Sequence, residues 1–344
     1  MSLTTDLLLD IASELNGFKI GKPWRFSEFS LVAVIPIIKP MELPRAYRLL
    51  SEAKEQVRIQ DTGSINKMDV TNNSEFPVLL KSGEILAGAT QERALTLSQF
   101  VMAGEKVTAD CVCVHSTKGI RAGQRVTPVE FCPPTVRSRV WDTCYAAHVH
   151  DGYGSEVGDT GYYGSGQQQV WASVNTHSSY LAATSDSFIS YCAESGIPVA
   201  SISSHWETPS DDLTGRIQES QKKFEAALKK IPKVADQIGL CLVSLDGFDS
   251  LDVFNHPDSW SAIREALIKS EAGDIANVAD NESLFDYRPE KAKELLKKLL
   301  GSPFTESKVV EKENTTTILL SGEKLKGEVV TLYEQPIHLS LLKA

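Results

Sequence analysis

A short phrase that occurs twice, near opposite ends of the chain, constrains the architecture more than any other feature. Residues 79–88 read LLKSGEILAG, and residues 319–327 read LLSGEKLKG. Each copy has an apolar run, a Ser-Gly-Glu turn and a second short run, which is typical of a strand-turn-strand unit. Gly83 and Gly322 stand where a tight turn favours a positive φ, which glycine adopts at little steric cost. The repeat predicts one supersecondary unit that is used twice.

The composition predicts a globular protein with one large or two medium domains. The chain has 344 residues, of which 42% are hydrophobic and 23% are charged, enough for a sizeable core. The net charge of −10 argues against nucleic acid as the main partner, because binding a phosphate backbone needs clustered Lys and Arg. No stretch approaches the roughly 20 apolar residues of a membrane span. The start shows no signal-peptide pattern and the six cysteines are dispersed, so we expect a cytoplasmic protein with free thiols.

The distribution of local patterns predicts an α+β fold. Between residues 57 and 115, turn signals recur among strand-like runs, which indicates an antiparallel sheet or β-sandwich. Pro134, Pro257 and Pro289 each stand where a helix can begin, since proline is tolerated in the first turn. Strands return from Lys308 onward. We therefore expect a sheet or sandwich built from N- and C-terminal strands, with a largely helical middle.

A segment rich in Gly and Tyr suggests where the chain divides. Residues 1–150 are expected to form a β-rich domain with an N-terminal helix, and residues 151–166 a loop. Residues 167–344 are expected to form an α+β domain whose last strands can pack on the first domain.

One predicted strand carries a candidate metal or nucleophile cluster. Cys111, Cys113 and His115 alternate along it and therefore share one face. Thiolates and imidazoles bind zinc and iron, although three ligands along one strand do not easily close a tetrahedron. Cys113 with His115 as base is a candidate nucleophile. The alternative is that the small thiols simply pack in the core.

The residues after the first Ser-Gly-Glu form the main candidate site. Glu84 can act as a general acid or base if burial or a partner tunes its pKa. The matching Glu323 of the second copy favours a plain turn residue instead. Arg93 can fork to a phosphate or a carboxylate. The predicted ligand-binding residues are Gly83, Gly88, Gln91 and Arg93.

The same stretch resembles a known family. GEILAGATQERALTLSQFVMAGEKVTADCVCVH, residues 83–115, is similar to the signature of the ARG and rhodanese-phosphatase-superfamily-associated domain family. Further segments resemble the family in the same order, at residues 133–136, 170–171, 239–257 and 319–342, so the resemblance covers nearly the whole chain after the N-terminal helix. Glu92 stands where the family usually has Asn, and His115 where it has Glu, without the Arg-Trp that follows. A ligand role of those family residues is therefore not carried over to this chain.

The family name implies a setting in NAD or ADP-ribose metabolism, which is an argument from association. The leading functional expectation is a binding or accessory module acting near NAD- or ADP-ribose-derived small molecules. One alternative is a hydrolase of a phosphorylated or ribosylated small molecule, with Glu84 as acid/base. Another is a structural protein that forms homo-oligomers through its sheet edges. The sequence identifies no cofactor.

Overall fold

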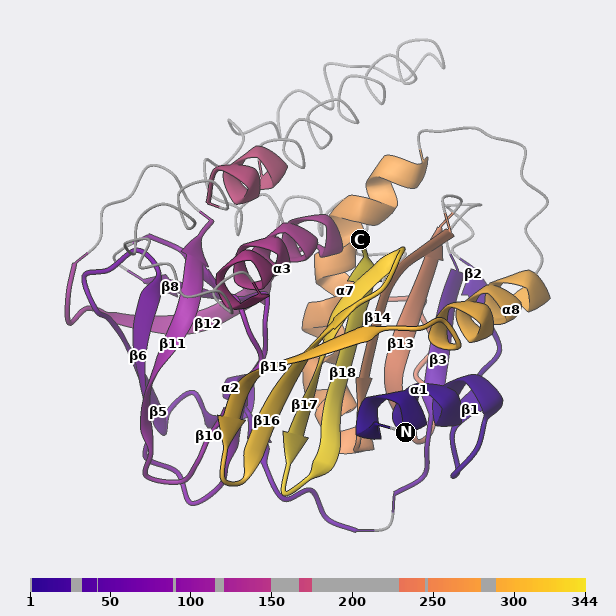
Figure 1. Ribbon diagram of the computed structural model, residues 1–344, viewed down its shortest axis with the longest axis horizontal. Coiled ribbons are helices and arrows are strands. Elements are labelled where there is room, and N and C mark those ends of the chain that lie inside the picture. Colours follow the sequence, from indigo (N-terminus) through magenta and orange to yellow (C-terminus); the bar gives the residue numbers. More distant parts are fainter. Residues whose placement is uncertain are drawn as a thin grey trace.

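The computed structural model describes residues 2–25, 33–41, 43–88, 91–114, 121–149, 167–174, 229–244, 247–279 and 289–344. Its described residues form a large antiparallel sheet and, beside it, a closed barrel joined by a small three-stranded sheet (Figure 1). The predicted loop at 151–166 and most of the helices predicted up to residue 228 lie outside the described residues.

The large sheet combines strands from both ends of the chain. Its order is β1-β3-β13-β14-β18-β17-β16-β15, and β2 pairs with β3. The strands are β1 (Lys19–Ile20), β2 (Trp24–Arg25), β3 (Ala33–Ile38), β13 (Gln237–Ser244), β14 (Gly247–Phe254), β15 (Thr305–Lys312), β16 (Thr315–Ser321), β17 (Leu325–Leu332) and β18 (Gln335–Lys343). The division predicted at 151–166 stays a prediction, although strands from both sides of it share this sheet.

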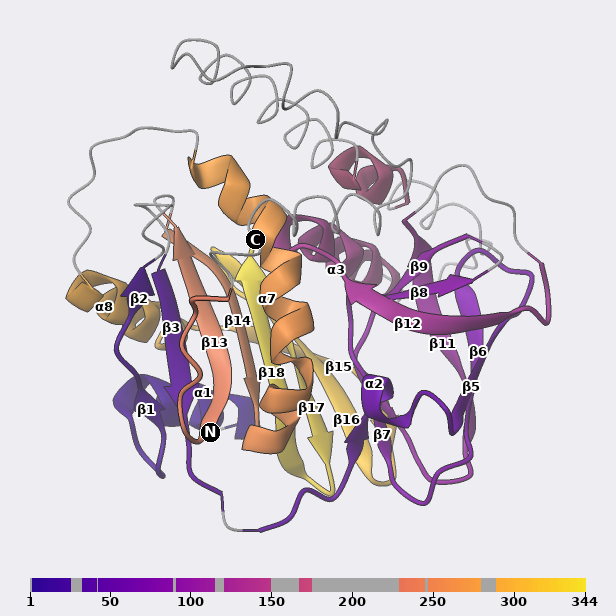
Figure 2. The same ribbon diagram turned by 180° about the vertical axis from the view of Figure 1, so that it is seen from behind.

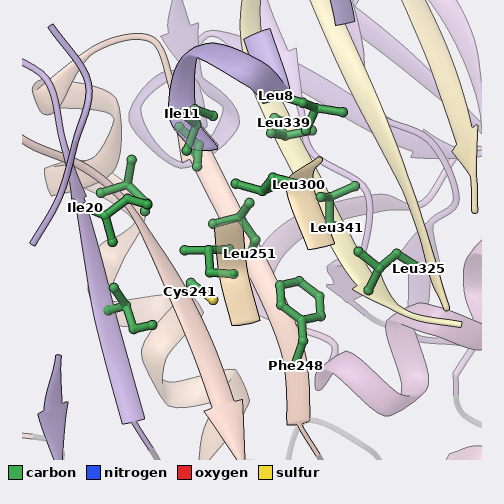
Figure 3. Packing of buried hydrophobic residues seen from close by; sticks show 14 of the residues in the cluster. Leu8, Ile11, Ile20, Cys241, Phe248, Leu251, Leu300, Leu325, Leu339 and Leu341 are labelled. Carbon is green, nitrogen blue, oxygen red and sulfur yellow. The ribbon is translucent and has the colours of Figure 1, made fainter. Parts of the chain in front are cut away.

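Helices cover both faces of the large sheet. On one face lie α1 (Leu3–Ser13) and α8 (Pro289–Leu300). α8 buries Ala292, Leu296 and Leu300, which recur every four residues and so share one side of the helix. Figure 3 shows this core, where Leu300 meets Leu251 and Leu341 of the sheet.

The opposite face of the sheet packs against α7 (Pro257–Ala279), which lies in front of it in Figure 2. α7 contributes Trp260, Ile263 and Leu267 at helical spacing. As expected, α7 and α8 begin at Pro257 and Pro289, and α3 (Pro134–Val149) begins at Pro134. Residues 167–174 are also helical. Among the described helices, none has the length and apolar character needed to cross a membrane.

The barrel closes in the order β11-β6-β5-β12-β8-β9. Its strands are β5 (Val57–Asp61), β6 (Lys67–Asn72), β8 (Glu84–Gly88), β9 (Arg93–Leu95), β11 (Lys106–Cys113) and β12 (Arg125–Phe131). The small sheet holds β4 (Arg48–Leu49), β7 (Val78–Leu80) and β10 (Gln99–Val101), and α2 (Leu50–Ala53) follows β4. Along β5 and β6, buried and more exposed residues alternate, as expected for strands with one face in the barrel interior.

The expectation of an α+β fold with a largely helical middle is wrong. The part of the chain that the structure describes is mostly β, with a six-stranded barrel and a large antiparallel sheet. The helical patterns at α3, α7 and α8 are real, but these helices are surface layers on sheets whose strands come from distant parts of the sequence. β3 and β13 pair although they lie about 200 residues apart along the chain, and no local sequence pattern predicts such a pairing.

The two copies of the repeated phrase have different structures. In the second copy, β16 and β17 pair as an antiparallel hairpin. In the first copy, β7 belongs to the small sheet and β8 to the barrel. The turn between these two strands therefore connects two different sheets. Gly83 has the expected positive φ of 77°, whereas Gly322 is not among the glycines with positive φ. One unit used twice is therefore not what the chain forms.

Candidate functional site

The turn at residues 81–84 is buried between the barrel, α3 and the large sheet. Gly83 donates its N–H to the Leu95 carbonyl at 2.8 Å, and its carbonyl accepts from the Cys132 N–H at 2.8 Å. A Cβ at Gly83 would lie 2.7 Å from Cδ of Arg137. A glycine is needed here both for its φ and for the closeness of the Arg137 side chain.

Two buried cations of this region share one carboxylate. The Lys81 ammonium lies 3.0 Å from Oδ1 of Asp252, and Nη1 of Arg137 lies 2.9 Å from Oδ2. Burial alone would raise the pKa of Asp252, but the charges of Arg137 and Lys81 outweigh it and hold that pKa well below its usual range. Asp252 is therefore ionised and ties the 81–84 turn and α3 to β14.

His338 on β18 also binds this carboxylate. Its Nε2 lies 3.1 Å from Oδ1 of Asp252 and donates to it. Burial and the Lys81 charge lower the pKa of His338, so the ring is neutral at physiological pH. His338 acts here as a neutral hydrogen-bond donor.

A second buried carboxylate, Glu328 on β17, receives the hydroxyl groups of the same loops. Ser82 and Ser98 both donate their hydroxyls to Oε1 of Glu328, and the Ser98 N–H donates to Oε2 at 3.0 Å. The indole of Trp141 on α3 donates to the Ser82 hydroxyl at 3.1 Å. We call the set Lys81, Ser82, Arg137, Asp252, Glu328 and His338 the junction cluster, because it joins barrel, helix and sheet.

Glu84, the predicted acid/base, begins β8 beside this cluster and is only 4% exposed. Burial raises the pKa of Glu84 to about 8, although a backbone hydrogen bond from Lys81 and the Lys81 charge oppose the shift. Its carboxyl is therefore mostly protonated at neutral pH and could donate a proton. Glu323, its counterpart in the second copy, is exposed, so the two glutamates have unrelated environments.

Arg93, the leading predicted ligand contact, lies in the barrel interior. It is fully buried, and its two terminal nitrogens bind both carboxylate oxygens of Asp61, at 3.3 and 2.9 Å. Asp61 also accepts the N–H groups of Gly63 and Arg121. The guanidinium is thus already engaged within the protein. Gln91 lies partly buried just before β9. The ligand roles of these residues stay predictions.

The predicted metal cluster is described only in part. Cys111 and Cys113 are fully buried on β11, and His115 lies outside the described residues. Burial raises the pKa of the Cys111 thiol to about 12, which disfavours the thiolate. Gln167 brackets the Cys113 backbone, donating to its carbonyl at 2.6 Å and accepting from its N–H at 2.8 Å. Within the described residues, no three His, Cys, Asp or Glu side chains are grouped to hold a metal ion.

An open hollow of about 390 Å³ lies on the outer surface of the barrel. We call it the arginine hollow; its described lining is Glu55, Val57, Arg58, Gln60, Asn73, Gly123 and Arg125. Arg125 on β12 is paired in register with Gln60 on β5, and the alternation along β5 turns Arg58 and Gln60 outward together. The two arginines therefore belong to one face.

The arginines of the hollow are exposed and available. Neither Arg58 nor Arg125 forms an ion pair or side-chain hydrogen bond with any residue that the structure describes. Gln60 holds the rim, because its Nε2 donates to the Gly123 carbonyl at 3.0 Å. Gly88, one of the predicted ligand residues, packs closely against β12, since a Cβ there would lie 2.7 Å from the Arg125 carbonyl oxygen. Neither Gly88 nor any other residue of the sequence-predicted sites is part of the described lining.

The fold and these sites define a class of β proteins in which a small barrel with an open basic hollow is fastened to a large sheet through buried charges. The family model of the ARG and Rhodanese-Phosphatase-superfamily-associated Protein domain matches residues 17–342, and the chain belongs to this family. No curated protein and no solved structure matches the chain significantly.

Proposed function

We propose that the protein is a cytoplasmic binding or accessory module for phosphate-bearing small molecules of the NAD and ADP-ribose type. The observation that carries this proposal is the arginine hollow. Its volume of about 390 Å³ lies within the range typical of small-molecule sites. It holds two arginines without an ion-pair partner in the described part of the chain.

The chemistry of the lining supports an anionic ligand with hydroxyl groups. Each guanidinium offers a planar fork of donors that fits phosphate oxygens, so two arginines suit two phosphates. Gln60 and Asn73 add amides, and Glu55 adds an acceptor. The protein as a whole is acidic, with a net charge of −10, so the pair of arginines is a local exception. The family name supplies the NAD and ADP-ribose context.

The hydrolase alternative has one observation in its favour, the raised pKa of Glu84. Glu84 and the junction cluster are enclosed by packed side chains, with Glu84 only 4% exposed. A reaction there would require that the 81–84 turn opens to admit a substrate. The arginine hollow requires no such movement, and we therefore favour binding.

Self-assembly through the edge strand β15 is disfavoured by its side chains. Lys308 pairs with Glu311 along the strand, and Lys312 pairs with Glu105 of the neighbouring loop. Charged side chains on an edge strand oppose pairing with a second copy.

A thermal-shift screen tests the proposal with NAD, ADP-ribose, AMP and ribose 5-phosphate. A ligand bound only by the folded state at 100 times its dissociation constant adds about 2.7 kcal/mol of stability. We expect a clear shift with ADP-ribose, which Arg125→Ala removes and Arg139→Ala retains. Arg139 is an exposed arginine on α3, outside the hollow. No shift with any of these compounds would contradict the proposal.

A further inference from the structure

We infer that the arginine hollow recognises the ribose-diphosphate part of its ligand and does not read the nucleobase. This inference rests on the proposed function and adds the chemical basis of selectivity. The observations that support this inference are the chemical groups of the lining and their positions on the barrel surface.

The described lining offers no aromatic ring and no broad apolar surface on which a base can stack. Nucleotide-binding surfaces that hold bases usually provide aromatic rings or broad apolar surface. Here Val57 is the one hydrophobic side chain of the described lining, and it is 4% exposed because it packs into the barrel interior. The remaining lining residues are charged, amide-bearing or glycine. A base would therefore stay largely in solvent.

The polar groups of the lining divide into two kinds. Arg58 and Arg125 are the cations and are suited to phosphate oxygens. Glu55 and Asn73 follow α2 and β6, respectively, and both are exposed. A carboxylate cannot stabilise a phosphate but accepts hydrogen bonds from vicinal ribose hydroxyls, the role that acidic residues have in dinucleotide-binding folds. We assign the arginines to the diphosphate and Glu55 to the ribose.

Gly123 adds no side chain to this surface. Its φ is 79°, and a Cβ there would meet nothing within 4 Å. Its N–H and carbonyl are already used by the Asp61 carbonyl and the Gln60 amide. The turn is thus fixed by the protein itself, and the ligand contacts come from the side chains around it.

Equilibrium titrations of the full chain with ADP, GDP, UDP, 2′-deoxy-ADP and adenosine test this inference. We expect dissociation constants for ADP, GDP and UDP within about threefold of one another, since the described lining has no aromatic ring that would favour one base. 2′-Deoxy-ADP should bind about tenfold more weakly, as for a lost hydrogen bond to a charged group. Adenosine, which has no phosphate, should not bind detectably.

Glu55→Ala identifies the group that reads the ribose. The readout is the dissociation constant for 2′-deoxy-ADP divided by that for ADP, because removing a negative charge also changes the phosphate affinity of both compounds. The ratio should fall from about ten to about one in Glu55→Ala. It should be unchanged in Glu313→Ala, an exposed glutamate in the β15–β16 turn.

The outcomes separate this inference from the proposed function. Binding of ADP and ADP-ribose without binding of GDP and UDP would overturn base-independent recognition and leave the proposed function standing. An unchanged ratio in Glu55→Ala would overturn the assignment of Glu55. Failure of every compound, ADP-ribose and NAD included, would overturn the proposed function and this inference with it.

Discussion

The Lys81 ammonium lies 3.0 Å from the Asp252 carboxylate, and both side chains are almost completely buried, with exposures of 1% and 6%. Lys81 lies in the turn just before the barrel strand β8, and Asp252 lies on β14, a central strand of the large sheet. The ion pair therefore holds together two sheets whose strands are far apart in sequence. Breaking it would leave a charge without its partner in a protein interior, which is costly.

The Asp252→Ala variant should be strongly destabilised, because Lys81 would lose its carboxylate and Arg137 would keep only that of Glu271, 3.7 Å away. We expect a loss of about 3–5 kcal/mol in the free energy of unfolding, measured by urea denaturation. Asp110→Ala is the matched control. Asp110 pairs with Lys67 at the surface, so its loss should cost less than about 1 kcal/mol. Equal effects of the two substitutions would show that the junction cluster does not hold the fold together.

Gly83→Ala should destabilise the protein more than Gly104→Ala does. Both glycines have a positive φ, 77° and 73°, so backbone strain of about 1–2 kcal/mol is common to both. Only at Gly83 would the new Cβ meet Arg137, at 2.7 Å, and Arg137 is held in place by Asp252. The difference in unfolding midpoint between the two variants measures that clash. Similar midpoints would mean that Arg137 moves aside freely.

The pH dependence of stability should carry the signature of Glu84. Its pKa is about 8 in the folded protein and its ordinary value is 4.5. Between these values the folded state binds more protons than the unfolded chain, so this carboxyl lowers the free energy of unfolding as the pH rises. Glu84→Gln should remove that contribution, and its stability relative to wild type should rise from about pH 5 to about pH 8 and then level off.

Glu323→Gln provides the control for that experiment, because Glu323 occupies the matching place in the second copy and is exposed. Its unfolding free energy should stay within about 0.5 kcal/mol of that of wild type, because substitutions at exposed positions cost little. A Glu84→Gln curve parallel to wild type would show that Glu84 ionises normally in the folded state.

How far the sequence could predict the structure is seen in the two Ser-Gly-Glu turns. Gly83 was correctly expected to have a positive φ, and the hairpin expected at the second copy is present as β16 and β17. The local sequence does not show that the Ser82 hydroxyl donates a hydrogen bond to Glu328, 246 residues further along the chain. Nor does it show that Ser321, the matching serine of the second copy, is exposed to solvent. Burial, which gives Glu84 and Glu323 different chemistry, is decided by tertiary packing.

The same limit applies to the candidate sites. The ligand role of Arg93 is predicted from its multi-donor guanidinium, which follows the first Ser-Gly-Glu turn, and the structure shows that this guanidinium pairs with Asp61 on a different strand. No local motif in the sequence marks Arg58 or Arg125 as a binding residue. The alternation of Val57, Arg58, Ile59 and Gln60 indicates that Arg58 faces outward, yet only the pairing of β5 with β12 brings Arg125 beside it. That pairing leaves no local pattern.

Arg93→Met should affect stability and not ligand affinity. It leaves Asp61 buried without its guanidinium, and we expect a loss of about 3–5 kcal/mol in urea denaturation. Asp61→Asn combined with Arg93→Met removes both charges and should recover part of this loss. Ligand titration of Arg93→Met, at a temperature where it remains folded, should give the wild-type dissociation constant. A large loss of affinity with intact folding would support the predicted role of Arg93 as a ligand contact.

The central claim is that two barrel arginines bind a phosphate-bearing ligand, and calorimetric titration with ADP-ribose tests it most directly. We expect saturable one-to-one binding by wild type and by Arg139→Ala. The Arg58→Ala/Arg125→Ala double variant should lose affinity by at least about a hundredfold, since two charge-assisted contacts are removed. Its unfolding midpoint should stay near that of wild type, because both side chains are exposed. Wild-type affinity in the double variant, or no binding by wild type, would contradict the claim.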